Sequence, residues 1–384
     1  MHILQGRILT PFQEFAGRVG VENGLIVAVG EDLPVGPEDR VDDFGDNYIC
    51  PGFFDLHVHG GKGFEVLDGE VRALEEIAAH LVRHGVTAFL GTTMAAPYQG
   101  MRRAAEAVKA FWQSDSVFAP ALIGLHLEGP CLNARQAGAQ PPEYLCGADQ
   151  EFYRLILEYL GVIKTVTLAP EVTGGLALAY KLKELGVYPS LGHTGASADL
   201  AREAFAGGVQ RVTHLFNAMP GIHHREPGLA VEALLNEDVF VELIADGVHV
   251  APRMVEMVWR LKGAKRVCLV SDAVRPAGLP DGEYTCRRQV MTVQDQQIRL
   301  VDGTLAGGYL TLAEAVRNLV AWGKIPLREG VEMVTATPAR AVGLADSLGS
   351  LAPGRRGDLV VLDHNLQVVF TMLCGKVVFR SSDA

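Results

Sequence analysis

Eight short apolar runs, most of them separated by helical patterns or glycine-rich turns, constrain the fold of this chain more than any other feature of its sequence. The runs are rich in β-branched residues, which favour strands, and good helix formers fill intervening segments such as 70–83, 99–111 and 198–206. Strands that alternate with helices indicate a parallel sheet, and eight such units in about 250 residues fit a (β/α)8 TIM barrel. The predicted strands are 52–58, 86–92, 121–127, 164–169, 187–191, 211–215, 239–245 and 266–271.

The two ends of the chain follow a different pattern. Residues 20–30 place strand-like runs around an Asn-Gly turn signal, and residues 357–363 and 368–379 again alternate between apolar and polar side chains. Neither end contains enough helix to form a further barrel unit. We therefore predict an α/β protein in which residues 1–50 and 349–384 form a small β-sandwich domain beside a barrel domain of residues 51–348.

The composition excludes several classes of protein. Of the 384 residues, 48% are hydrophobic and 21% are charged, which is typical of a globular protein and not of a disordered one. The net charge of -11 disfavours nucleic acid as a partner, because phosphate backbones need clustered lysine and arginine. No apolar run reaches the roughly 18 to 20 residues of a membrane span, and we expect no membrane partner. The absence of a signal-peptide pattern and six scattered cysteines predict a cytoplasmic location with reduced thiols.

The first predicted strand ends in His57-Val58-His59. Because strand side chains alternate with a period of two, both imidazoles point to the same side, where they can hold one divalent metal ion. An isolated pair of this kind would be better explained as two surface histidines in a loop. Further potential ligands at the ends of later strands favour the metal-binding interpretation. They are Glu128, His193, His214 and Asp272.

Barrel enzymes place their chemistry at the carboxyl ends of the strands. One carboxylate and two to four imidazoles at that mouth would make a mixed nitrogen and oxygen site, which suits Zn²⁺ or Fe²⁺. Each residue alone has an ordinary explanation, as a hydrogen-bonded histidine or a helix-capping aspartate, but their joint occurrence favours a metal site. Asp272 is the ionisable group left over to move protons between a metal-activated water and a leaving amine, and a role as a ligand also stays open.

These motifs resemble those of the amidohydrolase superfamily, and four segments together resemble the N-acetylglucosamine-6-phosphate deacetylases over essentially the whole chain. Many two-metal amidohydrolases use a carboxylated lysine on strand four. Here Lys164 lies at the opposite end of that strand, and Glu128 supplies the carboxylate. The four segments are Leu127-Glu128-Gly129-Pro130, Gly192-His193-Thr194, residues 213–219 and Arg225-Glu226-Pro227-Gly228.

The resemblance implies a set of roles. Glu128, His193 and His214 would hold the main metal ion, His57 and His59 allow a second one, and Asp272 would transfer protons. The cofactor is therefore one or two divalent ions per subunit, with Zn²⁺ favoured over Fe²⁺. The substrate contacts implied by the resemblance are Ala139, Gln140, Asn217, Ala218, Arg225, His249, Leu305, Ala306 and Gly307.

Two of these contacts also make independent physical sense. His249 follows strand seven and can donate to a sugar hydroxyl or to the amide carbonyl, with a structural role in the loop as the alternative. Arg225 lies beside His223 and His224 in an otherwise acidic chain and can clamp a phosphate, with a solvated surface loop as the alternative. In the family the arginine reaches across from the partner subunit, which implies a homodimer with Arg225 in the neighbouring active site.

The implied reaction is metal-dependent hydrolysis of the acetamido group of N-acetyl-D-glucosamine 6-phosphate, in amino-sugar catabolism or cell-wall recycling. Asp272 would act as the proton carrier, and His249 would assist the oxyanion. One alternative is an amidohydrolase for another N-acyl or cyclic amide, for which Arg225 would be superfluous. Another is a non-catalytic barrel, which has no need of the ligands and of Asp272.

The chain departs from some relatives at the first strand, where they carry polar non-histidine residues and use one metal, whereas His57 and His59 allow two. It also departs at Gly307-Gly308-Tyr309-Leu310, where small hydroxyl residues are expected. Cys131 closely follows the Glu-Gly-Pro turn, and we expect it near the metal.

Overall fold

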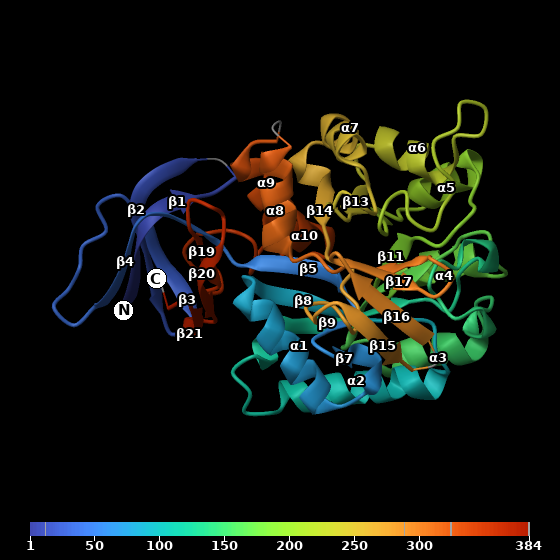
Figure 1. The fold of residues 1–384 in the computed structure, drawn as a ribbon, viewed down its shortest axis with the longest axis horizontal. Helices are drawn as coiled ribbons and strands as arrows, with labels where there is room; N and C mark the ends of the chain where they lie inside the picture. Colours follow the sequence, from blue (N-terminus) through green and yellow to red (C-terminus); the bar gives the residue numbers. More distant parts are fainter. Residues whose placement is uncertain (12, 288, 323–324, 383–384) are drawn as a thin grey trace.

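A closed parallel barrel forms the larger part of the computed structural model, which describes residues 1–11, 13–287, 289–322 and 325–382 (Figure 1). Its eight strands follow one another around the barrel in the order of the sequence, which confirms the predicted fold class. They are β5 (Phe53–Val58), β8 (Val86–Thr93), β9 (Leu122–Glu128), β10 (Ile163–Leu168), β11 (Tyr188–Leu191), β12 (Arg211–Val212), β13 (Phe240–Leu243) and β14 (Val267–Leu269).

Helices surround these strands because each presents one apolar stripe to the sheet. In α1, Leu74, Ile77 and Leu81 recur at helical spacing and are buried. Ser197 caps α5 by accepting a hydrogen bond from the amide of Leu200. The helices are α1 (Val71–Arg83), α2 (Tyr98–Trp112), α3 (Gln150–Glu158), α4 (Gly175–Glu184), α5 (Ala198–Ala206), α6 (Gly228–Leu235), α7 (Pro252–Lys262), α8 (Leu312–Ala321), α9 (Leu327–Val334) and α10 (Ala336–Ala341). Among the described residues, no helix combines the length and the apolarity that a bilayer crossing requires.

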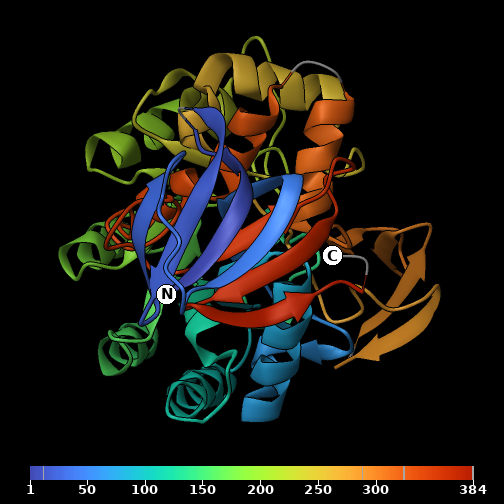
Figure 2. The same cartoon turned by 90° about the vertical axis from the view of Figure 1, so that its left-hand side faces the viewer.

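Both ends of the chain contribute strands to a second sheet, as predicted, and Figure 2 shows these strands side by side. The order is β21-β20-β19-β4-β1-β2-β3, and the ends meet where β4 pairs with β19. Leu4, Ile49, Leu359 and Phe370 are fully buried in its core. The strands are β1 (His2–Leu9), β2 (Glu14–Glu22), β3 (Leu25–Gly30), β4 (Arg40–Pro51), β19 (Leu359–Leu362), β20 (Val368–Leu373) and β21 (Lys376–Arg380).

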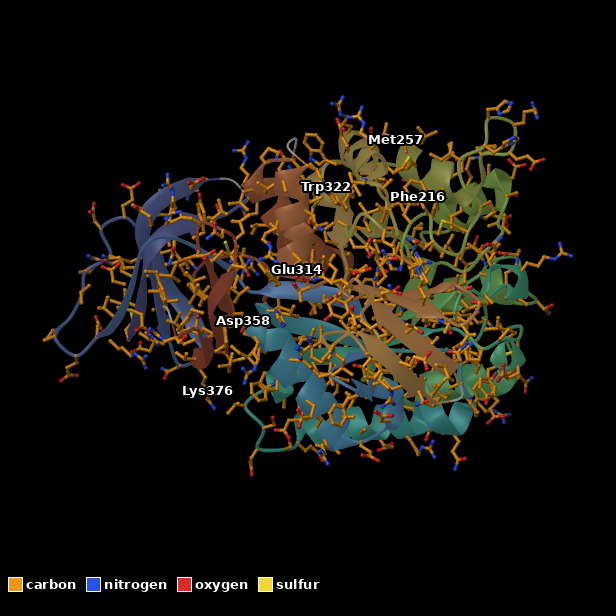
Figure 3. The ribbon with its side chains drawn as sticks, viewed as in Figure 1. Phe216, Met257, Glu314, Trp322, Asp358 and Lys376 are labelled. Carbon is orange, nitrogen blue, oxygen red and sulfur yellow. The ribbon has the colours of Figure 1, made fainter. Side chains whose placement is uncertain are left out.

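The small domain is tied to the barrel by buried polar contacts around Asp358, which Figure 3 labels at the junction. The carboxylate of Asp358 accepts hydrogen bonds from the amide of Cys374 at 2.8 Å and from Nε of Arg356 at 2.7 Å. The same guanidinium donates to the carbonyl of Thr87 in β8 at 2.9 Å. One arginine thus joins the terminal sheet to the barrel wall.

The barrel closes between β5 and β14 through a seam of few backbone contacts. The amide of Asp272 donates to the carbonyl of His57 at 3.0 Å, and Val58 forms a parallel bridge with Ala273. Below them the buried carboxylate of Asp55 accepts bonds from the amides of His57 at 3.1 Å and Ser271 at 3.2 Å. Burial raises the pKa of Asp55 to about 7, although these bonds act in the opposite direction. The seam therefore fixes His57 and Asp272 relative to each other.

Three predicted strands are clearly shorter than the sequence pattern indicated. The prediction of 211–215 extends beyond β12, that of 239–245 beyond β13 and that of 266–271 beyond β14. After β12 and β14 the backbone leaves the strand conformation, with positive φ values of 28° at His214 and 50° at Asp272. Backbone strain of this kind collects at functional sites, where a side chain must be aimed away from the regular sheet.

A four-stranded antiparallel sheet inserted after β14 was not predicted. Its strands are β15 (Gly282–Cys286), β16 (Gln289–Gln294), β17 (Gln297–Leu300) and β18 (Leu305–Gly307), and a small hairpin of β6 (Gly60–Gly61) and β7 (Phe64–Glu65) was also missed. Met291, Val293 and Ile298 anchor the inserted sheet in the main hydrophobic core. Its last strand carries the predicted substrate contacts Leu305, Ala306 and Gly307 to the barrel mouth.

Candidate active site

A cavity of about 350 Å³ opens at the carboxyl ends of the barrel strands, within the size range of a small-molecule site. It brings together all the predicted substrate contacts except Arg225. His57 lies buried beneath it. The lining residues are His59, Met94, Glu128, Gly138, Ala139, Gln140, His193, His214, Asn217, Ala218, His249, Asp272, Arg299, Thr304, Leu305, Ala306 and Gly307.

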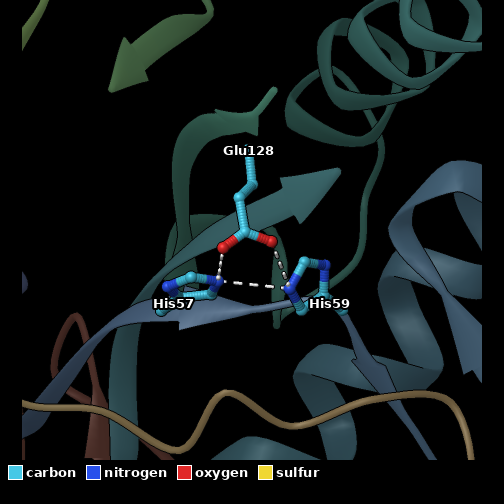
Figure 4. Close-up of side chains that lie close together, drawn as sticks. All are labelled: His57, His59 and Glu128. Carbon is cyan, nitrogen blue, oxygen red and sulfur yellow. Dashed lines mark hydrogen bonds and ion pairs between the residues drawn. The ribbon is translucent and has the colours of Figure 1, made fainter. Parts of the chain in front are cut away.

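Glu128 at the end of β9 belongs to two clusters of potential metal ligands. In the first, its Oε1 lies 3.1 Å from Nε2 of His193 and 3.0 Å from Nε2 of His214, and these two nitrogens are 3.1 Å apart. In the second, its Oε1 lies 3.5 Å from Nε2 of His57 and its Oε2 lies 3.3 Å from Nε2 of His59 (Figure 4). Ligands of a tetrahedral ion with bonds of about 2.0 to 2.1 Å are about 3.3 Å apart, so both donor sets fit a divalent cation.

The electrostatics of the clusters also suit a cation. Burial alone would raise the pKa of Glu128, but the charges of His193 and His57 outweigh burial and hold the pKa well below its usual range. Burial alone would lower the pKa of His59, yet contacts with Asp272 and Glu128 raise it to about 8. The two carboxylates thus favour positive charge at this point, whether it comes from protons or from a metal ion.

Polar contacts behind the ligands fix their orientation. Nδ1 of His57 lies 3.1 Å from Oε2 of Glu242, whose Oε1 accepts from Nη2 of Arg211 at 2.6 Å. Nδ1 of His193 lies 2.9 Å from the carbonyl of Gln136 and donates to it. With their Nδ1 protons held in this way, both rings present Nε2 to Glu128. Sequence reasoning missed Glu242 and Arg211. A sequence does not show that a charged residue in a strand is buried together with a partner from a distant part of the chain.

Asp272 lies beside the cluster of His57, His59 and Glu128. Its Oδ1 lies 3.4 Å from Nε2 of His57 and 3.3 Å from Nε2 of His59. Burial would raise the pKa of Asp272, but these imidazoles outweigh burial and lower it, so that the carboxylate is ionised and ready to accept a proton. The side chain keeps 13% of its exposure, and Asp272 lines the cavity.

His249 lines the cavity after β13 and is held by Asp246. Nδ1 of His249 lies 2.6 Å from Oδ2 of Asp246, and the amides of Val248 and His249 both donate to Oδ1 at 2.8 Å. Although burial acts in the other direction, these contacts lower the pKa of Asp246 and keep it charged. Nε2 of His249 is therefore left for a ligand in the cavity.

Arg225 does not line the cavity of its own chain. It lies in an exposed loop between β12 and α6, where its Nη1 is 2.8 Å from Nε2 of His224. Cys131 is fully buried and is not among the lining residues that the structure describes. Met94, Gly138, Arg299 and Thr304 do line the cavity, although no motif pointed to them. Arg299 and Thr304 could have been identified as candidates if the hairpin of β17 and β18 had been predicted from the sequence.

Comparisons with known proteins agree with the fold and with the family resemblance. A model of the amidohydrolase family matches residues 48–378. The chain is 35% identical over 373 residues to the N-acetylglucosamine-6-phosphate deacetylase of Bacillus subtilis, covering 96% of this chain and 94% of the relative. It is also 35% identical over 370 residues to the N-acetylgalactosamine-6-phosphate deacetylase of Escherichia coli O157:H7, covering 96% of each.

A solved structure shows the same similarity in three dimensions. It is that of a mutant N-acetyl-D-glucosamine-6-phosphate deacetylase from Mycobacterium smegmatis in complex with N-acetyl-D-glucosamine-6-phosphate. The TM-score is 0.92 at 33% sequence identity, and the match covers 98% of this chain and 99% of the other. The similarity therefore extends over the barrel and the terminal sheet together.

Proposed function

This chain belongs to the amidohydrolase family and, within it, to the N-acetylglucosamine-6-phosphate deacetylases, and we infer that it hydrolyses N-acetyl-D-glucosamine 6-phosphate to D-glucosamine 6-phosphate and acetate. The observation that carries this function is the convergence of Glu128, His193, His214 and Asp272 in one cavity. A second candidate substrate is the galactosamine epimer, which the similarity to the Escherichia coli relative favours.

The residues of the cavity divide the work of amide hydrolysis. Glu128, His193 and His214 would hold a divalent cation, which when bound would supply Lewis-acid polarisation of the carbonyl and a lowered pKa of water. Asp272 accepts the proton of the attacking water and returns it to the nitrogen as the C–N bond breaks, which gives the amine and acetate. Nε2 of His249 donates to the carbonyl oxygen as negative charge develops there.

We propose Zn²⁺ as the ion, with Fe²⁺ as the alternative, since both accept imidazole and carboxylate ligands. The cluster of Glu128, His193 and His214 supports one ion. The cluster of His57, His59 and Glu128 supports a second ion beside it, and His57 is already oriented as a ligand by Glu242. Glu128 belongs to both clusters.

Acetate release is the direct test of the function. We expect turnover of N-acetylglucosamine 6-phosphate, loss of turnover after chelation, and recovery on adding Zn²⁺. The ligand clusters consist of imidazole and carboxylate groups, which cannot replace the metal ion as the electrophile. Unphosphorylated N-acetylglucosamine serves as the control for the phosphate and should be turned over far less efficiently. The galactosamine epimer, assayed beside it, decides between the two candidate substrates. Equal kcat/KM for the phosphorylated and plain sugars would contradict the proposed substrate class.

We propose that the active unit is a homodimer in which Arg225 reaches the neighbouring active site. Its exposed position, outside the cavity of its own chain, supports this role. Arg225→Ala should raise KM for the phosphorylated sugar about 10- to 100-fold, the loss expected of a charge-assisted hydrogen bond, and leave kinetics on the plain sugar nearly unchanged.

Steady-state kinetics and light scattering check this prediction together. Arg83→Ala, which removes an exposed arginine at the end of α1, is the matched control and should change neither KM. A monomeric wild-type enzyme with full activity, or an equal effect of Arg225→Ala on both sugars, would remove Arg225 from the phosphate site.

We further propose that the reaction takes place in the cytoplasm, as a step of amino-sugar catabolism or cell-wall recycling. All six cysteines are free, and four of them are buried. Reduced thiols in these numbers are typical of a reducing compartment. The amine product of the reaction is a phosphorylated sugar, whose charge retains it in the compartment where it is made.

A further inference from the structure

The cavity contains one permanent cation of its own chain. Among its described lining residues, Arg299 is the only lysine or arginine. A sugar phosphate is close to a dianion at neutral pH, and the chain as a whole carries a net charge of -11, which repels anions. On the basis of the proposed function, we propose that Arg299 binds the 6-phosphate of the substrate within the same subunit and sets the preference for phosphorylated sugars.

Arg299 is brought to the cavity by the inserted sheet. It lies in β17 directly opposite Leu305 of β18, the first of three consecutive residues of β18 that line the cavity. Thr304, in the turn between these strands, lines the cavity as well. The hairpin of β17 and β18 thus places Arg299, a half-buried residue, on the wall formed by the predicted substrate contacts.

The guanidinium is oriented but keeps donors free. Its Nη1 donates to the carbonyl of Gly303 at 2.8 Å, and its Nε and Nη2 donate to Oε1 of Gln297 at 3.2 and 2.9 Å. Arginine has five N–H groups, so one on Nη1 and one on Nη2 remain for a ligand. Because both partners are neutral, the positive charge is not cancelled locally.

Neighbouring arginines differ in this respect. Arg275 forms ion pairs with Glu65 and Asp68, and Arg287 pairs with Glu65. Arg299 forms no such ion pair with any residue that the structure describes. A fixed guanidinium with two free donors and no carboxylate partner is what recognition of a phosphate requires. With Arg225 of a second subunit, it would hold the phosphate from two sides.

The alternative is that Arg299 only closes its own hairpin. The two roles differ in what they affect: phosphate recognition changes KM for the phosphorylated sugar alone, whereas loss of the hairpin would change kcat for both sugars and lower the melting temperature. Arg299→Gln removes the charge but keeps a hydrogen-bond donor. Arg299→Lys keeps the charge but loses the fork of donors, and should fall between wild type and Arg299→Gln.

The experiment combines kinetics with a binding measurement. Arg299→Gln should raise KM for N-acetylglucosamine 6-phosphate about 10- to 100-fold, with kcat and the kinetics on plain N-acetylglucosamine within about twofold of wild type. Calorimetric titration with glucosamine 6-phosphate should show a matching rise in Kd. Arg287→Gln, which removes a charge from the same sheet but away from this cavity, is the control and should leave both values unchanged.

The outcomes separate this proposal from the proposed function. If the wild type releases acetate from the phosphorylated sugar and Arg299→Gln matches it in KM and Kd, the proposal is wrong and the function stands. If the wild type releases no acetate but Arg299→Gln weakens glucosamine 6-phosphate binding, the function is wrong and the phosphate site stands. A parallel loss on both sugars with a lower melting temperature assigns Arg299 to the hairpin and overturns the proposal.

Discussion

Asp272→Asn should lower kcat about 10³- to 10⁴-fold and leave the protein folded with its metal in place, because an amide has nearly the shape of the carboxylate but cannot carry a proton. Asparagine, like aspartate, tolerates the positive φ of 50° at this position better than most non-glycine residues do, so the backbone at the barrel seam should be retained. The hydrogen bond from the amide of residue 272 to the carbonyl of His57 does not involve the side chain.

Three measurements on purified protein check this expectation. They are acetate release, the melting temperature and the bound metal per subunit. Asp346→Asn, at a fully exposed carboxylate, is the control and should match wild type in all three. Residual turnover above about one tenth of wild type would exclude Asp272 as the proton carrier. Loss of the metal together with activity would instead make Asp272 a ligand.

Glu128→Gln should remove metal from both clusters and abolish turnover, because Glu128 is the one carboxylate that they share. Binding free energies of about 10 to 16 kcal/mol for four-ligand zinc sites correspond to about 3 kcal/mol per ligand, or a loss of affinity on the order of 100-fold. The loss should be larger still where the same substitution affects two ions.

His59→Asn is the matched variant, since it changes only the cluster that includes His57. Elemental analysis of wild type should give two ions per subunit, of His59→Asn one, and of Glu128→Gln close to none. A wild-type content of one ion, unchanged in His59→Asn, would contradict a second site. Metal retained at full stoichiometry in Glu128→Gln would show that neither cluster is the metal centre.

The barrel could be predicted because its strands and helices repeat with clear periods. Runs such as 86–92 and 121–127 are largely apolar, which is typical of parallel strands buried on both faces. The ligand candidates could be found because they stand at the ends of those runs. Apart from Arg225, which lies on an exposed loop, the structure places every predicted site residue in or directly beneath one cavity.

The inserted sheet could not be placed in the same way. Its strands break the alternation with helices, and β15 is largely exposed, so neither a barrel period nor a strong apolar run marks it. The available sequence signal was the alternation of the apolar Met291 and Val293 with polar residues; both are buried in β16. The positive φ at His214 and the pairing of Arg211 with Glu242 depend on tertiary contacts that a single sequence does not display.

The seam at Asp55 links catalytic competence to the order in which the chain folds. Asp55 and the amide of Ser271 are 216 residues apart in the sequence, so their contact has one of the largest loop-closure costs in the barrel. His57 and Asp272 acquire their relative positions only when this contact forms. A chain that lacked the eighth barrel strand would still carry Glu128, His193 and His214 but not Asp272, and we expect it to be inactive towards amides. Deacetylase activity is therefore a readout of barrel closure and would appear later in refolding than helical structure.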